Sequence, residues 1–244
     1  MTRFNAEFSR LYGVPDQAPS VQSPAFAPVK VMVLELARPA DWAVLSSVWR
    51  AVQSDLELPA PAIAVSGNDG LQLWFSVAQP VPASEAADFL AALRQQYLAA
   101  ISESRLGLYP SRTGLVVGKG GLARAVPAVD AHTGHWSAFV SADLVSVFGD
   151  EPWLDIPPNR DQQADILSRL MPMPLPAWRE ALLRLAAAQH PSASAVVPAS
   201  AQVPPAGDAR EQGPRAFLMQ VMHDPTVALR DRVEAAKALL PYER

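Results

Sequence analysis

The sequence predicts an α+β protein, and three observations lead to that prediction. Strand-like and helix-like apolar patterns alternate in the order β-α-β-β-α-β over residues 29–110. Half of the 244 residues are hydrophobic, which is enough for a substantial core. The chain also has 24 prolines, about twice the usual share, and several fall in two segments that show no period. Those segments, 13–28 and 189–213, bound the predicted domain.

The first predicted strand is the apolar run 29–36, which is rich in β-branched residues. A helix is expected to follow between Pro39 and Pro59, with Asp41 at its start. Large apolar residues recur there at steps of three and four, at Trp42, Leu45, Val48, Trp49, Val52 and Leu56. This spacing predicts that the helix packs its tryptophans against a sheet.

Residues 63–66 and 71–78 are predicted as two short strands joined by a hairpin, because Gly67, Asn68, Asp69 and Gly70 tolerate positive φ. Ser84 is expected to cap a second helix, which carries Phe89, Leu90, Leu93, Tyr97 and Ile101 on one side. A fourth strand is expected near 107–109. The resulting order is that of a ferredoxin-like (RRM-like) core, in which two helices cover one sheet face and the other face stays open.

Further elements are expected after this core: strands at 114–117, 122–126 and 136–140, then helices at about 160–170 and 176–188. The predicted organisation is an irregular N-terminal arm (1–28), an α+β domain (29–188), a Pro/Ala/Ser-rich linker (189–213) and a helical tail (214–244). The stretch 1–188 has 14 basic and 18 acidic residues, and the tail has 5 and 4. Neither part is strongly charged overall.

Composition excludes several kinds of site. The chain has no cysteine, so disulfides, thiolate nucleophiles and Cys-based zinc sites are excluded. No stretch reaches the ~18 apolar residues of a membrane span, and the first residues lack the apolar core of a signal peptide. We therefore expect a cytoplasmic protein. His132 and His135 are three residues apart, but no carboxylate cluster accompanies them, so no metal site is predicted.

Four segments carry a family resemblance: VLEL (33–36), SGNDGLQLWF (66–75), YPSRT (109–113) and GHWSAF (134–139). In this order they resemble motifs of the archaeo-eukaryotic primase and primase-polymerase superfamily, over roughly residues 29–170. The resemblance implies a protein of a phage, plasmid or integrated element. In that family two acids on the first strand and a third acid hold two divalent metals, and a histidine near the second motif's end lies by the nucleotide phosphates.

This chain departs from the pattern at each of those positions. Glu35 is the single acid of the first strand, Gln72 stands where histidine is expected, and Thr113 stands near the third acid. A two-metal centre needs several carboxylates, and glutamine supplies neither a proton nor a positive charge. The resemblance therefore implies a catalytically degenerate domain with Glu35 as a remnant acid, no confident catalytic residue and no cofactor; Mg²⁺ or Mn²⁺ would be needed only by an active enzyme.

A local excess of positive charge marks the candidate nucleic-acid or nucleotide-binding residues. Residues 94–124 contain five basic side chains against Glu103 alone. If the following strands lie beside the open sheet face, basic side chains would contact phosphates and Trp74 or Tyr109 would stack on bases. Together with two positions implied by the family motif, the predicted binding set is Ser66, Gln72, Trp74, Arg112, Lys119 and Arg124. Ordinary solvated arginines are the alternative interpretation.

The tail, 214–244, resembles a helical segment of phage small terminase subunits and related mobile-element proteins. Its two segments, PRAFLMQVMHDPT (214–226) and LRDRVEAAKALLPY (229–242), read as two amphipathic helices. Their apolar side needs a partner, either the rest of the chain or a second protein. The predicted partner-binding residues are Phe217, Leu218, Met222, Val233 and Leu240.

Three functions stay open from the sequence. The leading one is a non-catalytic, primase-polymerase-like protein that binds nucleic acid or nucleotide. The second is a DNA-packaging or assembly adapter that acts through its C-terminal helices and contacts a protein partner. The third is an active metal-dependent nucleotidyltransferase. The sequence does not distinguish DNA from RNA.

Overall fold

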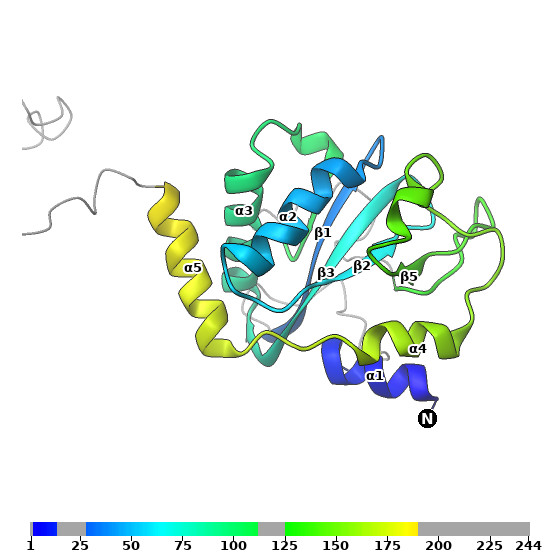
Figure 1. The fold of residues 1–244 in the computed structure, drawn as a ribbon, viewed down its shortest axis with the longest axis horizontal. Coiled ribbons are helices and arrows are strands. Elements are labelled where there is room, and N and C mark those ends of the chain that lie inside the picture. Colours follow the sequence, from blue (N-terminus) through cyan, green and yellow to red (C-terminus); the bar gives the residue numbers. More distant parts are fainter. Residues whose placement is uncertain (1, 14–27, 112–124, 190–244) are drawn as a thin grey trace, which may run out of the picture. The chain divides into compact units, whose positions relative to one another are not determined.

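The computed structural model describes residues 2–13, 28–111 and 125–189 (Figure 1). The strand predicted at 114–117, nearly all of the one at 122–126, the linker beyond Gln189 and the tail 214–244 lie outside the described residues. None of the described helices combines the length and the apolar character that a membrane span requires.

A five-stranded sheet forms the centre of the described chain. Its strands are β1 (Pro28–Ala37), β2 (Ala62–Val65), β3 (Gly70–Pro82), β4 (Leu106–Tyr109) and β5 (Ala138–Val140), in the order β4-β1-β3-β2-β5. Every neighbouring pair is antiparallel. The first four strands have the order 4-1-3-2 that the β-α-β-β-α-β pattern requires, so the predicted ferredoxin-like core is confirmed. β5 adds one strand beside β2.

Helices cover one face of this sheet, as predicted for the two helices of the ferredoxin-like core. α2 (Trp42–Ser54), α3 (Ala83–Tyr97) and α5 (Leu175–Gln189) pack there (Figure 1). Asp41 caps α2, since its carboxylate accepts a hydrogen bond from the Val44 amide at 3.1 Å. The predicted cap of α3 is wrong: Pro82 occupies the N-cap position, one helical residue lies before Ser84, and no side chain caps this end. The fully buried core includes Leu34, Leu73, Phe89 and Trp178.

The second face was expected to stay open, and that expectation is wrong. α1 (Arg3–Tyr12) and α4 (Arg160–Ser168) pack across it (Figure 1). Their apolar side chains form a second core with residues of the sheet: Phe4, Leu11, Tyr12, Val33, Trp74, Phe139, Ala164 and Leu167. The irregular arm predicted for 1–28 is therefore a helix over Arg3–Tyr12, because Phe4, Phe8, Leu11 and Tyr12 recur at helical spacing and bury one side. Burial also raises the pKa of the Tyr12 phenol well above its usual range.

Short elements connect these layers. The predicted hairpin joins β2 to β3, where Gly67 adopts φ +80° and its amide donates to the Pro152 carbonyl. The 3₁₀ turn η1 (Glu103–Arg105) precedes β4, and η2 (Val145–Phe148) follows β5. α4 is tied to β5 by Gln163, whose side chain accepts from the Phe139 amide at 2.7 Å and donates to the Phe139 carbonyl at 2.9 Å.

Candidate functional site

Glu35 lies on the central strand β1, on the face covered by α1 and α4. Its Cα partner on β3 is Gln72 and its Cα partner on β4 is Gly107. Directly opposed residues of antiparallel strands share a face, and adjacent strands are ~4.8 Å apart. Glu35 and Gln72 are therefore neighbours on one side of the sheet.

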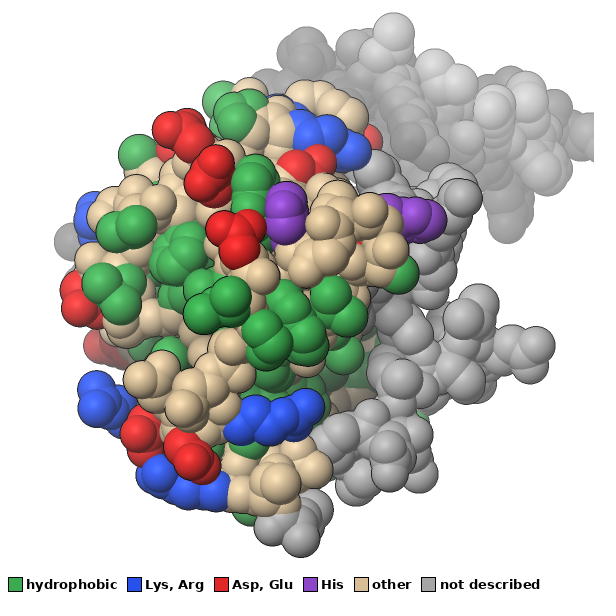
Figure 2. Space-filling view, turned by 90° about the vertical axis from the view of Figure 1, so that its right-hand side faces the viewer, with side chains coloured by type: hydrophobic (Ala, Val, Ile, Leu, Met, Phe, Trp, Pro, Cys, Tyr) green, Lys and Arg blue, Asp and Glu red, His purple; other side chains and the backbone are tan. Residues whose placement is uncertain are grey.

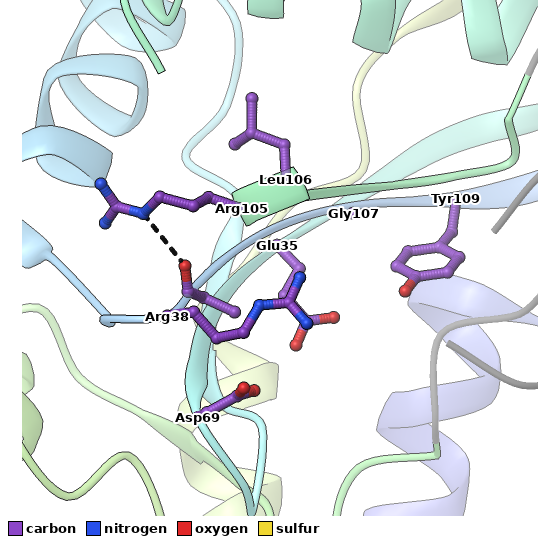
Figure 3. A pocket seen from close by; sticks show the side chains of 8 residues that line it. Glu35, Arg38, Asp69, Arg105, Leu106, Gly107 and Tyr109 are labelled. Atoms are coloured by element: carbon purple, nitrogen blue, oxygen red, sulfur yellow. Dashed lines mark hydrogen bonds between the residues drawn. The ribbon is translucent and has the colours of Figure 1, made fainter. Parts of the chain in front are cut away.

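A pocket of about 50 Å³ opens beside Glu35 (Figure 3). Charged side chains reach it from three chain segments that the sheet order brings together: the end of β1, the β2–β3 hairpin and the start of β4. The lining residues are Glu35, Ala37, Arg38, Asp69, Arg105, Leu106, Gly107 and Tyr109. Two acidic and two basic residues thus line one small pocket, in which the Arg105 guanidinium is turned toward the Ala37 and Pro39 carbonyls.

The two arginines are held by backbone carbonyls. Arg105 donates from Nε to the Ala37 carbonyl at 3.2 Å and from Nη2 to the Pro39 carbonyl at 2.8 Å (Figure 3 shows the first bond). Arg38, whose φ is +54°, donates from Nη2 to the Ser104 carbonyl. Its amide donates to the Asp69 carbonyl at 3.2 Å, which links the end of β1 to the hairpin. The two bonds of Arg105 fix the plane of its guanidinium, and one bond tethers that of Arg38.

Two glycines make room for the side chains of the pocket. A Cβ at Gly70 would lie 2.8 Å from Glu35 Oε1, closer than a carbon atom can approach that oxygen. A Cβ at Gly107 would lie 2.8 Å from Cε2 of Tyr109, whose ring covers the strand there. Glu35 is half-buried in this cradle, while Tyr109 is 9% exposed. Any side chain at either glycine would displace one of these groups.

Gln72, Trp74 and Ser66 were predicted to contact nucleic acid or nucleotide, and all three are buried. Trp74 Nε1 donates to Gln72 Oε1 at 2.9 Å, and the Trp74 ring packs edge-on against Tyr12 and Phe139. This arrangement leaves no face of the indole for a base to stack on, because α1 covers it. Ser66 Oγ accepts from the amides of Asn68 and Gly70, so its hydroxyl holds the hairpin.

The described residues do not fit a two-metal centre. On β1 the same-face neighbours of Glu35 are Val33 and Ala37, so this strand presents one carboxylate to the pocket. Asp69 is a second acid, but Arg38 and Arg105 stand beside it and offset the negative charge that two cations need. Within the described ranges no group of three or more His, Asp or Glu side chains is placed to hold a metal ion.

Several predicted site residues lie outside the described residues. They are Arg112, Thr113, Lys119 and Arg124, and in the tail Phe217, Leu218, Met222, Val233 and Leu240. The roles assigned to them from the sequence stay predictions.

Sequence reasoning did not assign the pocket roles of Arg38 and Asp69, and it counted Arg105 only as part of a basic stretch. Arg105 and the Ala37 carbonyl that it binds are 68 positions apart. The available signal was the strand order 4-1-3, which places the end of β1, the hairpin before β3 and the start of β4 at one end of the sheet.

A larger hollow of about 210 Å³ lies where the ends of α2 and α3 meet α5. Its lining includes Asp55, Tyr97 and Arg184. Partial burial, with the charge of Asp55 and a 3.3 Å hydrogen bond to that carboxylate, raises the pKa of Tyr97 to about 12. Arg184 bridges Glu57 and Glu180, each at 2.9 Å. These polar groups pair with one another and tie the helices together.

Comparison with known proteins gives a weak similarity to solved structures. No protein-family model matches the chain, and no curated protein matches it. Among solved structures, the chain is similar to the polymerase domain from Mycobacterium tuberculosis Ligase D in complex with DNA, with 20% identity and a TM-score of 0.26. The match covers 66% of this chain and 52% of that one, so the chain spans about half the length of that structure. A TM-score this low establishes neither a common fold nor a common activity.

Proposed function

We propose that the described domain binds nucleic acid or a nucleotide and does not catalyse nucleotidyl transfer. The observation that carries the proposal is the pocket beside Glu35, whose lining combines Arg38 and Arg105 with the acidic residues Glu35 and Asp69. In a chain of net charge −4, two guanidinium groups fixed at one pocket wall are a local concentration of phosphate-binding chemistry.

Because the pocket is lined by both acidic and basic side chains, it suits a nucleotide, which has a phosphate and hydrogen-bond donors, better than a simple anion. Guanidinium groups bind phosphate oxygens, whereas carboxylates such as Glu35 and Asp69 accept hydrogen bonds from sugar hydroxyls and base amines. Arg105 uses two N–H donors in its bonds to backbone carbonyls, and a guanidinium has five. A pocket of about 50 Å³ accommodates a phosphate-sized group, so the rest of the ligand would extend over the surface.

The absence of catalysis follows from charge. Two divalent ions bring a charge of +4, and aligning the attacking and leaving oxygens between them needs several carboxylates. Glu35 is the one acid on its face of β1, and the arginines beside it oppose cation binding. We therefore propose a binding protein related in architecture to primase-polymerases, with Arg112, Lys119 and Arg124 as further phosphate contacts predicted from the sequence.

The test is fluorescence anisotropy with labelled single-stranded DNA, single-stranded RNA and a nucleoside triphosphate, each with wild type, Arg38→Gln and Arg50→Gln. Arg50 is the matched control, because it is an exposed arginine on α2, which covers the opposite face of the sheet. The proposal expects Arg38→Gln to weaken binding and Arg50→Gln to leave it nearly unchanged. Equal effects of the two variants would contradict the assignment of the pocket.

Primer extension with Mg²⁺ or Mn²⁺ tests the second half of the proposal. We expect no incorporation by the purified protein. Metal-dependent incorporation that Glu35→Ala abolishes would instead identify an active nucleotidyltransferase. If the wild type binds no nucleic acid or nucleotide at ~50 mM salt, where electrostatic attraction is weakly screened, the adapter function predicted for the tail takes first place.

A further inference from the structure

Residues 125–159 carry acidic side chains but no lysine or arginine. This segment is described without a gap and contains five carboxylates. Asp130 is buried, where its carboxylate accepts hydrogen bonds from the amides of His132 and Thr133 and fixes a loop. The other four acids are exposed: Asp143, Asp150, Glu151 and Asp155. We call this segment the acidic segment.

The acidic segment also carries most of the large apolar side chains that the described part of the chain exposes. The described part of the chain exposes six large apolar residues, and four of them belong to the acidic segment: Val129 (50%), Leu144 (52%), Val147 (73%) and Ile156 (70%). The Val147 amide donates to the Leu144 carbonyl, so these two lie within one turn. Figure 2 views this side of the molecule and shows hydrophobic side chains gathered in the middle of the face, with acidic side chains and histidine above them and a basic side chain below them.

Hydrogen bonds and ring stacking hold the acidic segment in a defined shape, although little of it is regular structure. Trp136 and Leu154 exchange two backbone hydrogen bonds, at 2.8 and 3.0 Å, and Trp136 also forms a bridge with Val129. The rings of His135 and Trp153 stack with centroids 4.6 Å apart and an interplanar angle of 4°. A preformed surface loses little conformational entropy when it binds a partner.

We propose that the acidic segment is a docking surface for a basic amphipathic helix of a protein partner. Apolar side chains of that helix would cover Val147 and Ile156, and its lysines or arginines would lie against Asp143, Asp150, Glu151 and Asp155. The acidic segment has four exposed carboxylates and no lysine or arginine of its own, while Arg169 lies near Asp143 and His135 lies 3.9 Å from Asp155. The acids outnumber these basic groups, so a cationic polypeptide is a better complementary partner than nucleic acid or an anionic membrane. This segment contributes no lining residue to the pocket beside Glu35, and the proposal does not depend on nucleic-acid binding.

The experiment uses the full chain and a fluorescein-labelled peptide of about 15 residues, long enough to form a helix, with leucines on one face and lysines elsewhere. A second peptide carries glutamates in place of the lysines. We expect the lysine peptide to bind and the glutamate peptide not to bind. We also expect hydrogen exchange to slow within residues 143–156 when the lysine peptide is present. Equal binding of both peptides, or protection confined to other segments, would overturn the proposal.

Substitutions in the acidic segment test where the lysine peptide binds. The double change Val147→Ser and Ile156→Ser should weaken binding of the lysine peptide roughly tenfold, since two apolar side chains lose their buried contacts. Asp150→Asn with Glu151→Gln should weaken it too, with a smaller salt dependence. Leu183→Ser is the matched control, because Leu183 on α5 is 72% exposed and Val147 is 73% exposed. Loss of binding in the Leu183 variant to the same extent would overturn the proposal, as would self-association of the wild type through residues 143–156.

Discussion

Replacing Gln163 tests how α4 is fixed to the sheet. Gln163 is 5% exposed, and its amide makes both hydrogen bonds of Phe139, at 2.7 Å to the backbone amide and 2.9 Å to the carbonyl. Phe139 lies on β5, whose paired neighbour in the described sheet is β2. The glutamine side chain therefore takes the place of a further strand and satisfies two buried backbone groups at that edge.

Gln163→Met keeps the length of the side chain and removes both hydrogen-bonding groups. Each buried backbone group left without a partner costs about 1–3 kcal/mol, so the two together predict a loss of about 3 kcal/mol, allowing for some relaxation of the edge strand. In a domain of this size that loss corresponds to a fall of about 6–12 °C in the melting temperature. Gln162→Met is the control, because Gln162 is exposed on the same helix. Its effect should be within about 0.5 kcal/mol of zero.

Urea denaturation followed by circular dichroism measures both variants. Gln163→Glu adds a pH test, since an ionised carboxylate accepts from the Phe139 amide but cannot donate to its carbonyl. Burial raises the pKa of such a carboxyl in the folded state, so its stabilising form is present at low pH and lost as pH rises through the folded value. The deficit of this variant against wild type should therefore shrink as pH falls. Equal stabilities of Gln163→Met and Gln162→Met would refute the reasoning.

Two further changes probe the pocket and the helix ends. Gly70→Ala places a Cβ 2.8 Å from Glu35 Oε1, which must move, and 3.1 Å from the Leu36 carbonyl oxygen. We expect it to destabilise the fold by about 1 kcal/mol and to weaken ligand binding, whereas Gly149→Ala, whose nearest contact is 3.7 Å away, should change little. Denaturation curves with equal midpoints would contradict this. The pKa of Tyr97 is raised to about 12, so the unfolded chain loses this proton first and stability falls as pH rises from about 10 through 12. Ultraviolet titration should show Tyr97 ionising earlier in Asp55→Asn, and an unchanged titration would contradict the assigned cause.

The core of the fold was predictable because its signals are local. Strand and helix periods placed β1, α2, the β2–β3 hairpin and α3 in the right order. The covered second face was missed, although β3 shows a signal: five of the seven residues 71–77 are apolar, and Leu73, Trp74 and Phe75 are consecutive, as in strands buried on both faces. α1 was missed because the prolines after residue 13 set the boundary, while the helical spacing of Phe4, Phe8 and Leu11 precedes them.

The candidate site was only partly predictable, for a physical reason. Glu35 and Gln72 are opposite each other on paired strands, which the order of the motifs already implied. Arg38, Asp69 and Arg105 come from three separate turns, and only the strand order brings turns together. Trp74 is buried by α1 and α4. Because the sequence did not place these helices on its face of the sheet, it could not show that the Trp74 ring is covered.

The most direct test of nucleic-acid binding is the salt dependence of affinity for single-stranded DNA, measured by anisotropy with wild type and with Arg112→Ala, Lys119→Ala and Arg124→Ala combined. Each phosphate contact contributes ~0.7 to 0.9 to the slope of log K against log salt. We predict that the wild type binds at ~50 mM salt and that the triple variant lowers the slope by roughly two to three units. Absence of binding by the wild type at this salt, or equal slopes for the two proteins, would contradict the account.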